Sequence, residues 1–536
     1  MKSITKGITR HSWLIISLVA VLSSSLYLAY ARSHGLAGFP LDDAWIHQTY
    51  ARNLAQTGQL AYLPGQPSAG STSPTWSFIL SVAYMLKIDF HLWTYLIGCL
   101  ALAATAWLTY RLFLRIGMKG KGSGAALLAG LLCAVEWHLV WASVSGMETI
   151  LFTALSLGLL EYYFSHVAAV RSQAGEPASV RKEQTIVRAI GIGLLAGLLV
   201  LTRPEGAVLA GMVLLAMVGV PWPSTRDELK LRLVAAGVAA MAMAAVLSPY
   251  VAFNLRTSGT IFPNTFYAKQ AEYQTNLPIW TRLWQVLSPT LAGAQVLLLP
   301  GFVYSVYHLI SRSRVQRERP GLHDRDWSTL LPVVWWLAIL GLYAVRLPVN
   351  YQHGRYTMPS IPLLVLYGVW GTAEIVRPRS SRLWLRVLSR TVPAAAAVLA
   401  LLFWWRGASA YRDDVGFIEG EMVAVAQWLD EHTSPGDLIA VHDIGAIGYL
   451  TDRPLLDLAG LITPEVIPFI ADAGRLADWM AARGAAYVVF FPDFSSTYAQ
   501  LAAEPRFQQL HCADHAWTRQ VGQHNLCVYR LLSSHD

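Results

Sequence analysis

Long apolar segments recur along the whole chain and are separated by short polar connections. Each runs for roughly 15 to 25 residues, about the length that a helix needs to cross the hydrocarbon core of a membrane. Only 14% of the 536 residues are charged, against about 25% in ordinary soluble domains. The sequence therefore predicts an α-helical polytopic membrane protein embedded in a lipid bilayer. The candidate spans are 13–30, 91–112, 124–141, 147–166, 188–202, 206–221, 232–253, 290–311, 329–346, 358–376 and 391–405.

One further apolar segment, 76–86, is short for a crossing, and the basic residues decide how to count it. If it does not cross, the Arg- and Lys-rich connections all fall on the side of the N-terminus, which the positive-inside rule makes cytoplasmic. We therefore predict that 76–86 is a juxtamembrane or re-entrant helix and that about 11 helices span the membrane. Most basic residues then serve to orient the helices in the membrane, which explains the net charge of +8. Nucleic acid is therefore not expected as a partner.

The same assignment gathers the other polar connections on the opposite, outer side of the membrane. These are the first outer loop 31–90, the turns 145–149 and 202–206, the long loop 254–289 and the loop 350–356. The C-terminal region falls outside as well. We therefore divide the chain into a transmembrane domain, residues 1–405, and an extracytoplasmic domain, residues 406–536.

The C-terminal region has a globular composition and reads as an α/β domain. Helices are predicted at 417–431 and 474–483, and short apolar runs at 438–441 and 487–491 read as buried strands, which suggests a small parallel sheet. Gly445 and Gly448 lack the spacing of a dinucleotide fingerprint. Two of the four cysteines, Cys512 and Cys527, lie in this region. Spacing does not prove that they pair, but an exported domain favours a disulfide.

Two adjacent carboxylates, Asp42 and Asp43, follow the break at Pro40-Leu41 and open an amphipathic segment. They could cap a helix, because carboxylates satisfy the free amide groups at its N-terminus and complement its dipole. Alternatively, one of them could act as a general base that accepts the proton of an attacking hydroxyl group. Either residue suits this role, and Asp42 is the first choice.

Other polar groups fall in the outer connections. The loop 65–76 is rich in small residues and precedes a helix that begins near Pro74, so it is either a simple turn or a loop whose amides face a phosphate or sugar. The run 262–269 mixes aromatic rings with Asn264, Tyr267 and Lys269. It suits either an interfacial anchor or a site for a sugar and a phosphate.

Two pairs of polar residues lie near the membrane boundary, and each pair allows two interpretations. Arg203 and Glu205 could simply pair with each other, or they could shape the lipid-facing end of a site. His353 and Arg355 raise the same question, and Arg355 is the better phosphate ligand because its guanidinium can hold two oxygens. No tight cluster of His, Cys and carboxylate residues occurs in the sequence, so no metal site is assigned. Assistance by a divalent metal stays open, and no other cofactor is expected.

Several of these motifs resemble those of a known group of enzymes. The first outer loop, with the Asp-Asp pair, is similar to that of bacterial GT-C glycosyltransferases, particularly those like the mycobacterial terminal arabinofuranosyltransferase. The run 355–359 is similar to one in the protein mannosyltransferase and aminoarabinose transferase relatives. The resemblance covers nearly the whole chain, in order. Its motifs are 42–46, 50–53, 70–76, 145–149, 202–206, 263–269, 355–359 and 443–449.

The resemblance implies a GT-C membrane glycosyltransferase that uses a polyprenyl-phosphate sugar donor and an outer-loop Asp as general base. By position this base is Asp42, with Asp43 beside it. The acceptor would be a hydroxyl group of a cell-envelope glycan or glycolipid, and the enzyme would sit in the bacterial cytoplasmic membrane. Alternatives are a protein O-glycosyltransferase and a transporter of lipid-linked sugars. The donor-site candidates are Lys269, Arg355, Arg203, Tyr267, Asn264 and His353, and the candidates for acceptor binding or loop support are His47, Arg52 and Glu205.

Overall fold

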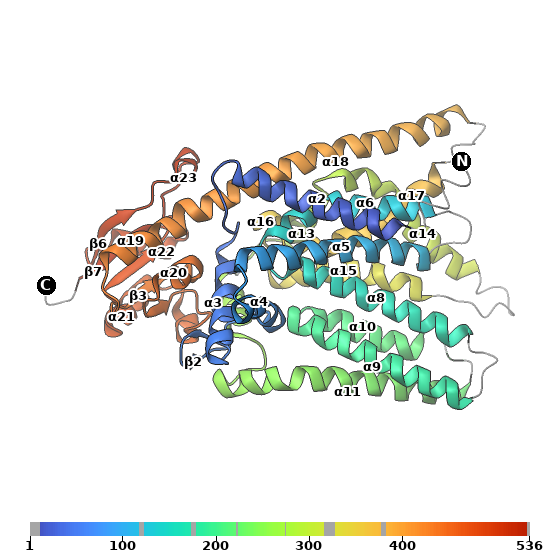
Figure 1. The fold of residues 1–536 in the computed structure, drawn as a ribbon, viewed down its shortest axis with the longest axis horizontal. Coiled ribbons are helices and arrows are strands. Elements are labelled where there is room, and N and C mark those ends of the chain that lie inside the picture. Colours follow the sequence, from blue (N-terminus) through green and yellow to red (C-terminus); the bar gives the residue numbers. More distant parts are fainter. Residues whose placement is uncertain are drawn as a thin grey trace.

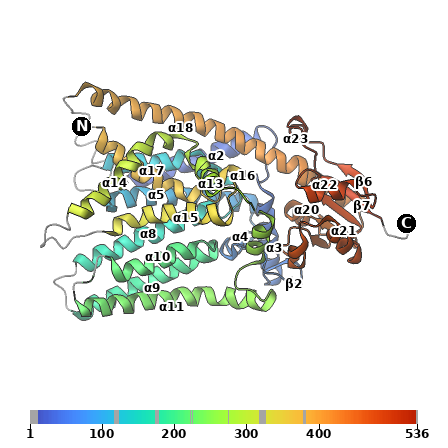
Figure 2. The same ribbon diagram turned by 180° about the vertical axis from the view of Figure 1, so that it is seen from behind.

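Long helices lie side by side in a bundle, and a smaller α/β unit packs against one end of it (Figure 1). We describe a computed structural model of the chain, which covers residues 11–116, 123–172, 178–220, 223, 225–273, 275–315, 327–376 and 382–532. Figure 2 shows the bundle from behind, with the α/β unit again at one end only. The bundle consists of apolar helices, many with exposed leucine, valine and tryptophan side chains, as expected for surfaces that face lipid.

Within the described residues, eight helices are long and apolar enough to cross a membrane. A ninth span results if α6 (Ser123–Val135) and α7 (Trp137–Val144), which meet at a bend of 51°, are counted together. The long helices are α2 (Ser12–Arg32), α5 (Phe90–Ile116), α8 (Thr149–Ser172), α9 (Ala178–Thr202), α11 (Arg226–Thr257), α14 (Leu299–Val315), α15 (Leu331–Arg346) and α18 (Leu383–Ile418).

Each predicted span corresponds to one of these helices, to the bent pair, or to one of two shorter helices. The shorter helices are α10 (Gly206–Gly219), with 14 residues, and α17 (Ile361–Ile375), with 15 residues. A straight helix needs about 20 residues to cross the hydrocarbon core. When the bent pair is counted as one span, these two helices make up the difference between about 11 predicted spans and the nine recognised by length in the described residues.

The segment 76–86 lies in α4 (Pro74–Leu86), a helix of 13 residues. The Ser73 hydroxyl accepts a hydrogen bond from the Trp76 amide and caps its N-terminus, and Pro74 starts the first turn. At 1.5 Å per residue such a helix is about 20 Å long, too short for a hydrocarbon core of about 30 Å. It lies beside α3 (Asp42–Thr57) at the end of the bundle that faces the α/β unit (Figure 1).

Short elements fill the same end of the bundle. The first outer loop carries a two-stranded hairpin of β1 (Ala61–Leu63) and β2 (Gln66–Pro67). The other elements at or leading into this end are α12 (Asn264–Glu272), α13 (Ile279–Leu291), α16 (Tyr351–Gly354), and the 3₁₀ turns η1 (Ala294–Leu298) and η4 (Met358–Ser360). A further 3₁₀ turn, η3 (Trp327–Leu330), precedes α15.

The α/β unit contains a five-stranded mixed sheet with the order β4-β3-β5-β7-β6. β3 (Ile439–Val441) pairs in parallel with β4 (Leu455–Asp457) and β5 (Tyr487–Phe490), whereas β7 (Cys527–Leu531) runs antiparallel to β5 and to β6 (Phe507–Cys512). The helices around it are α19 (Ala424–His432), α20 (Ile444–Thr451), α21 (Ala473–Ala482), α22 (Ser496–Ala503) and α23 (Ala516–Gln520), with the π turn η5 (Glu419–Val423) and the 3₁₀ turn η6 (Pro464–Phe469).

The predicted strands 438–441 and 487–491 correspond to β3 and β5, and the helix at 474–483 corresponds to α21. These two strands pair in parallel, as the sequence suggests, but the sheet as a whole is mixed, because β7 and β6 add antiparallel pairings. β6 has an exposed Gln508, Gln509 and Leu510 and lacks the continuous apolar run of a buried strand. Cys512 and Cys527 stand opposite each other on β6 and β7 and form a disulfide.

The α/β unit is fixed to the bundle by buried polar and apolar contacts. The Tyr62 hydroxyl donates a hydrogen bond to the carbonyl oxygen of Ile444, and the amide of Asn264 donates to the carbonyl oxygen of Leu461. One continuous hydrophobic core includes Ile444 and Ile447 together with buried residues of α3. The first outer loop thus lies between the bundle and the α/β unit.

Candidate active site

Asp42 and Asp43 occupy the first two positions of α3. Neighbouring residues of a helix point about 100° apart, so the two carboxylates face different surroundings. Acidic residues in the first turn complement the helix dipole, but among the described residues neither carboxylate accepts a hydrogen bond from an amide of α3 itself. Their further partners differ completely.

The carboxylate of Asp42 faces the α/β unit. Its two oxygens accept hydrogen bonds from the backbone amides of Gly445, at 2.7 Å, and Ala446, at 2.8 Å, in the first turn of α20. The pKa of Asp42 is raised to about 7, mainly by burial and further by the negative charge of Asp443. The two amide hydrogen bonds lower this pKa, but they do not outweigh burial. Asp42 is therefore a link between α3 and α20.

Asp43 turns instead toward two cations. Its Oδ2 atom forms an ion pair with the guanidinium of Arg355 and lies 3.5 Å from the ammonium nitrogen of Lys269. Burial alone would raise the pKa of the Asp43 carboxyl, but Lys269 and Arg355 outweigh it and hold the pKa well below its ordinary range. Asp43 is therefore ionised and held between two positive charges.

Tyr356 joins the same cluster. Its hydroxyl oxygen accepts hydrogen bonds from Lys269, at 3.0 Å, and from Arg355, at 3.1 Å. Burial would raise the pKa of Tyr356, but Arg355 and Lys269 lower it to about 8. The side chain of Arg355 is only 3% exposed, and its Nη1 atom has no hydrogen-bond partner in the part of the chain that the structure describes. Buried guanidinium groups ordinarily satisfy their donors, so this one is available to a ligand.

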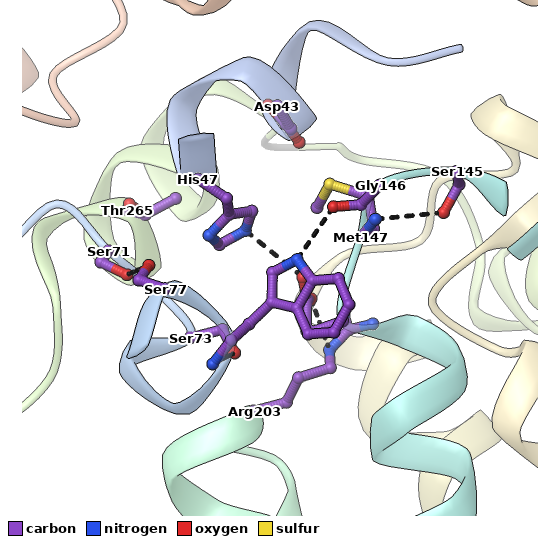
Figure 3. A network of polar contacts seen from close by, with 12 residues as sticks. Asp43, His47, Ser71, Ser73, Ser77, Ser145, Gly146, Met147, Arg203 and Thr265 are labelled. Carbon is purple, nitrogen blue, oxygen red and sulfur yellow. Dashed lines mark hydrogen bonds and ion pairs between the residues drawn. The ribbon is translucent and has the colours of Figure 1, made fainter. Parts of the chain in front are cut away.

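A second chain of charged groups begins one helical turn along α3. His47 Nε2 lies 3.3 Å from Glu148, and Glu148 lies 3.7 Å from Nε of Arg203. Asp43 and His47 project from the same helix on one side of this network, and Arg203 enters from the other side (Figure 3). Burial would raise the pKa of Glu148, but the hydrogen bond from His47 and the charge of Arg203 lower it to about 2.

Arg203 also pairs with the carboxylate that follows it in the chain. Its Nε atom lies 2.9 Å from Glu205, and its Nη2 atom donates a hydrogen bond of 2.9 Å to the hydroxyl of Tyr343. Tyr343 in turn hydrogen-bonds Glu205. The guanidinium carbon of Arg203 lies 5.0 Å from the ring centre of Tyr356, which joins this chain to the Asp43 cluster.

The two clusters line one cavity of about 480 Å³. Its charged groups are four cations and three carboxylates, His47 and a few uncharged polar side chains lie among them, and the rest of its wall is largely apolar. The fourth cation is Arg346, at the end of α15, whose guanidinium lies 4.5 Å from the ring centre of Phe266. The lining includes Asp43, His47, Gly70, Ser71, Thr72, Met147, Glu148, Arg203, Glu205, Val208, Phe262, Phe266, Lys269, Leu342, Tyr343, Arg346, Leu347, Arg355, Tyr356 and Leu461.

The cavity gathers six of the residues that the sequence singles out: Asp43, His47, Arg203, Glu205, Lys269 and Arg355. The pairing expected between Arg203 and Glu205 is present as well, and both residues line the cavity. Gly70 to Thr72 of the small-residue loop also reach the wall. These residues come from five separate segments of the chain.

Five other residues that the sequence singles out do not line the cavity. Asp42 faces α20, and Asn264 ties α12 to the α/β unit. Arg52 pairs with Asp452 and donates to the carbonyl oxygen of Tyr449, so it supports the contact with that unit. His353 pairs with Asp414 at 2.7 Å and lies beside Trp137 and Trp141. Tyr267 is half-buried on α12, with its ring against that of Phe266.

Three polar side chains of the cavity could not be identified as site residues from the sequence. Tyr343 and Arg346 end an apolar span, where a tyrosine and an arginine read as interfacial anchors. Glu148 lies in a turn that the sequence marks only as part of a motif. Among the described residues no group of three His, Cys, Asp or Glu side chains is arranged to hold a metal ion.

Comparison with known proteins gives a match to the C-terminal unit and to the whole fold. Residues 409–529 match a family model described as a domain of unknown function, DUF8728. No curated protein matches the chain. Solved structures, however, match nearly all of it.

The structure of ArnT from Cupriavidus metallidurans bound to undecaprenyl phosphate matches with a TM-score of 0.57 and 15% identity, over 98% of this chain and 99% of ArnT. The oligosaccharyltransferase AglB from Archaeoglobus fulgidus, in complex with an inhibitory peptide and a dolichol-phosphate, gives 0.58 and 13%, over 94% of this chain and 73% of AglB. The arabinofuranosyltransferase AftD from mycobacteria gives 0.51 and 15%, over 98% of this chain but 40% of AftD. All three are glycosyltransferases with the GT-C fold, and the likeness shows that this chain has the same fold.

Proposed function

We propose that this multi-pass membrane protein, which has the GT-C fold, is a glycosyltransferase. It would move a sugar from a polyprenyl-phosphate donor to a hydroxyl group of a cell-envelope glycan or glycolipid. The observation that carries the proposal is one cavity in which a carboxylate, Asp43, stands beside Lys269 and Arg355, with Arg346 in the same wall. Solved structures with this fold contain undecaprenyl phosphate or a dolichol-phosphate, which supports a lipid-phosphate donor.

The cavity has separate features for the two ends of such a donor. Arg346, Lys269 and Arg355 supply charged donors for phosphate oxygens, and Nη1 of Arg355 lacks any other partner. Phe262, Val208 and Leu342 are part of an apolar wall that suits a prenyl chain. A free nucleotide sugar has no such chain, and its base and ribose would find few polar partners on this wall.

The proposed reaction is an in-line displacement at the anomeric carbon. The acceptor oxygen bonds to C1 while the bond from C1 to the phosphate oxygen breaks, and that electron pair stays on the phosphate. Asp43 accepts the proton of the acceptor hydroxyl, and the configuration at C1 inverts. The phosphate gains one negative charge as it leaves, and the cations of the cavity stabilise this charge. In this assignment Asp43 replaces Asp42 as the general base, because Asp42 faces α20.

The remaining residues would hold the site in shape and bind the sugar. Arg203 is paired with Glu148 and Glu205, so its charge is largely balanced within the cavity wall. His47 Nδ1 is buried and has no hydrogen-bond partner among the described residues, so it suits a hydroxyl group of a sugar ring. Arg52 and Asn264 would support the contact with the α/β unit, and His353 would act outside the donor site.

The proposal includes an orientation in the membrane. Arg111 and Arg115 lie at the end of α5 that points away from the α/β unit (Figure 1). By the positive-inside rule this end is cytoplasmic. The cavity and residues 406–536 would then be extracytoplasmic, in a bacterial cytoplasmic membrane, and residues 1–405 would form the transmembrane domain.

The test is a transfer assay with protein purified into lipid nanodiscs. Polyprenyl-phosphate sugars are offered as donors together with cell-envelope glycan, glycolipid or peptide acceptors. We expect transfer to a glycan or glycolipid, with an inverted anomeric product. Transfer only to peptide Ser or Thr would favour the protein O-glycosyltransferase alternative, and movement of the donor across the membrane without any transfer would favour a transporter.

A further inference from the structure

Lys269 and Arg355 are already occupied by groups of the protein itself. Asp43 pairs with both of them, and the Tyr356 hydroxyl accepts a hydrogen bond from each. Arg355 is almost fully buried, so its guanidinium has little freedom to turn toward another partner. A phosphate that uses these two cations must therefore compete with the Asp43 carboxylate for them.

Two cationic groups keep capacity to bind a phosphate. Nη1 of Arg355 is buried and has no hydrogen-bond partner among the described residues, whereas Nη2 of the same group is taken by Asp43 and Tyr356. Arg346 stacks on Phe266 and forms no ion pair with a carboxylate among the described residues. An anion entering the cavity can thus make its first contact with Arg346, and a small shift of Arg355 would bring the unpaired Nη1 atom to it.

We propose that the donor phosphate replaces the Asp43 carboxylate on Lys269 and Arg355, so that Asp43 becomes free to act as a base only after the donor has bound. This inference rests on the proposed glycosyltransferase function and concerns the order of events in the same site. The phosphate first meets Arg346 and Arg355, then takes over Lys269. The displaced carboxylate turns toward the space where the acceptor hydroxyl arrives.

Electrostatics favours this exchange. Four cations and three carboxylates line the cavity, so one positive charge is in excess, and it matches the single negative charge of a sugar phosphodiester. While Asp43 holds two cations it is a poor base, since these cations stabilise its charged form. When the phosphate neutralises them, burial dominates and favours the protonated carboxyl. Donor binding thereby raises the proton affinity of the group that must accept the acceptor proton.

The exchange also determines the order in which the donor and the acceptor bind. Without the donor, Asp43 is engaged and cannot activate a hydroxyl group. With the donor in place, a free carboxylate stands next to the anomeric carbon. The donor is thus expected to bind first, and the site has no active base while it is empty.

The first test measures binding of polyprenyl phosphate, the lipid product, to wild-type protein and to the variant Asp43→Asn in nanodiscs. The variant removes the competing charge, so we expect it to bind polyprenyl phosphate about tenfold more tightly although it transfers sugar far more slowly. Glu205→Gln is the matched control, because Glu205 lies in the same cavity but contacts neither Lys269 nor Arg355. It should tighten binding clearly less than Asp43→Asn.

Equal affinities of Asp43→Asn and the wild type would overturn the exchange and leave the proposed function standing. Equal tightening by Asp43→Asn and Glu205→Gln would also overturn it, because general repulsion would then suffice. If polyprenyl phosphate binds to none of the proteins, the proposed function fails together with the exchange. A second measurement uses wild-type protein with ¹³C-labelled aspartate, so it does not depend on folding of the variant. The Asp43 carboxyl signal should titrate at a higher pH when polyprenyl phosphate is bound, and an unchanged titration would contradict the exchange.

Discussion

Asp42 and Asp43 are neighbours in the chain, yet they belong to two different regions of the molecule. Asp42 lies at the contact between the bundle and the α/β unit, where it binds backbone amides of α20. Asp43 lies in the cavity, where it binds two cations. The first arrangement fixes the position of a helix, and in the exchange that we propose the second gives up its partners to a ligand. Two identical side chains at the start of one helix thus have separate roles, because different parts of the chain pack against each of them.

The largest expected effect comes from removing one carboxylate charge at a time, which tests whether Asp42 and Asp43 differ in role. Asp43→Asn should lower the transfer rate by about a thousandfold, since general base catalysis contributes roughly 10²–10⁴-fold. Asp42→Asn should stay within about tenfold of the wild type, because the amide oxygen still accepts one hydrogen bond from α20. Transfer rates in nanodiscs, with donor at saturation, measure both. A larger loss in Asp42→Asn than in Asp43→Asn would reverse the assignment.

The second expected effect concerns the cations on the Asp43 side. Arg355→Lys keeps the positive charge but loses the guanidinium fork, so we expect transfer to fall on the order of a hundredfold. Arg52→Lys is the matched control, because Arg52 pairs with Asp452 on the side of the α/β unit. It should keep most of its activity. Similar losses in both variants would mean that the two regions do not differ as described.

The third effect concerns the close approach on the Asp42 side. A Cβ atom on Gly445 would lie 2.0 Å from the carbonyl oxygen of Asp42, so Gly445→Ala must push α20 away from α3. We expect a loss of stability of about 1–3 kcal/mol, seen as a lower Tm in a thermal unfolding scan. Gly436→Ala is the control, since a Cβ there meets nothing within 4 Å. Equal Tm values for the two variants would contradict the tight contact.

The smallest effect is the pH dependence of stability that Asp42 introduces. Its pKa is raised to about 7 in the folded protein, above the ordinary value of 3.8. Between these values the folded state binds a proton that the unfolded state has lost, so this group's contribution to stability falls as pH rises. The Tm of the wild type should therefore decline more steeply between pH 5 and pH 8 than that of Asp42→Asn. Parallel Tm curves would show that Asp42 does not titrate in this range.

The sequence predicts the bundle well and the site in part. Apolar length locates every long helix, because the requirement to cross a membrane acts on each segment separately. The outer motifs likewise point to Asp43, Arg203, Lys269 and Arg355, which the fold brings into one cavity. The choice between Asp42 and Asp43 could not be predicted, because it depends on α20, about 400 residues further along the chain. The antiparallel strand β6 escaped detection because its exposed side chains lack an apolar run.

Arg346 and Tyr343 show a second limit of sequence reasoning. They end an apolar helix, and the positive charge there fits a topological role as well as a functional one. Only the packing of α15 against the loop 202–206 places the Tyr343 hydroxyl on Arg203 and Glu205. Contacts between distant segments, rather than residue types, make these two side chains part of the cavity.

A structure of the Asp43→Asn variant with an intact polyprenyl-phosphate sugar, which this variant should consume only slowly, tests the assignment of the base most directly. The account predicts the phosphate within hydrogen-bond distance of Lys269, Arg355 and Arg346, with the prenyl chain along the apolar wall near Phe262 and the anomeric carbon facing residue 43. A phosphate bound elsewhere, or an anomeric carbon facing Asp42, would contradict it.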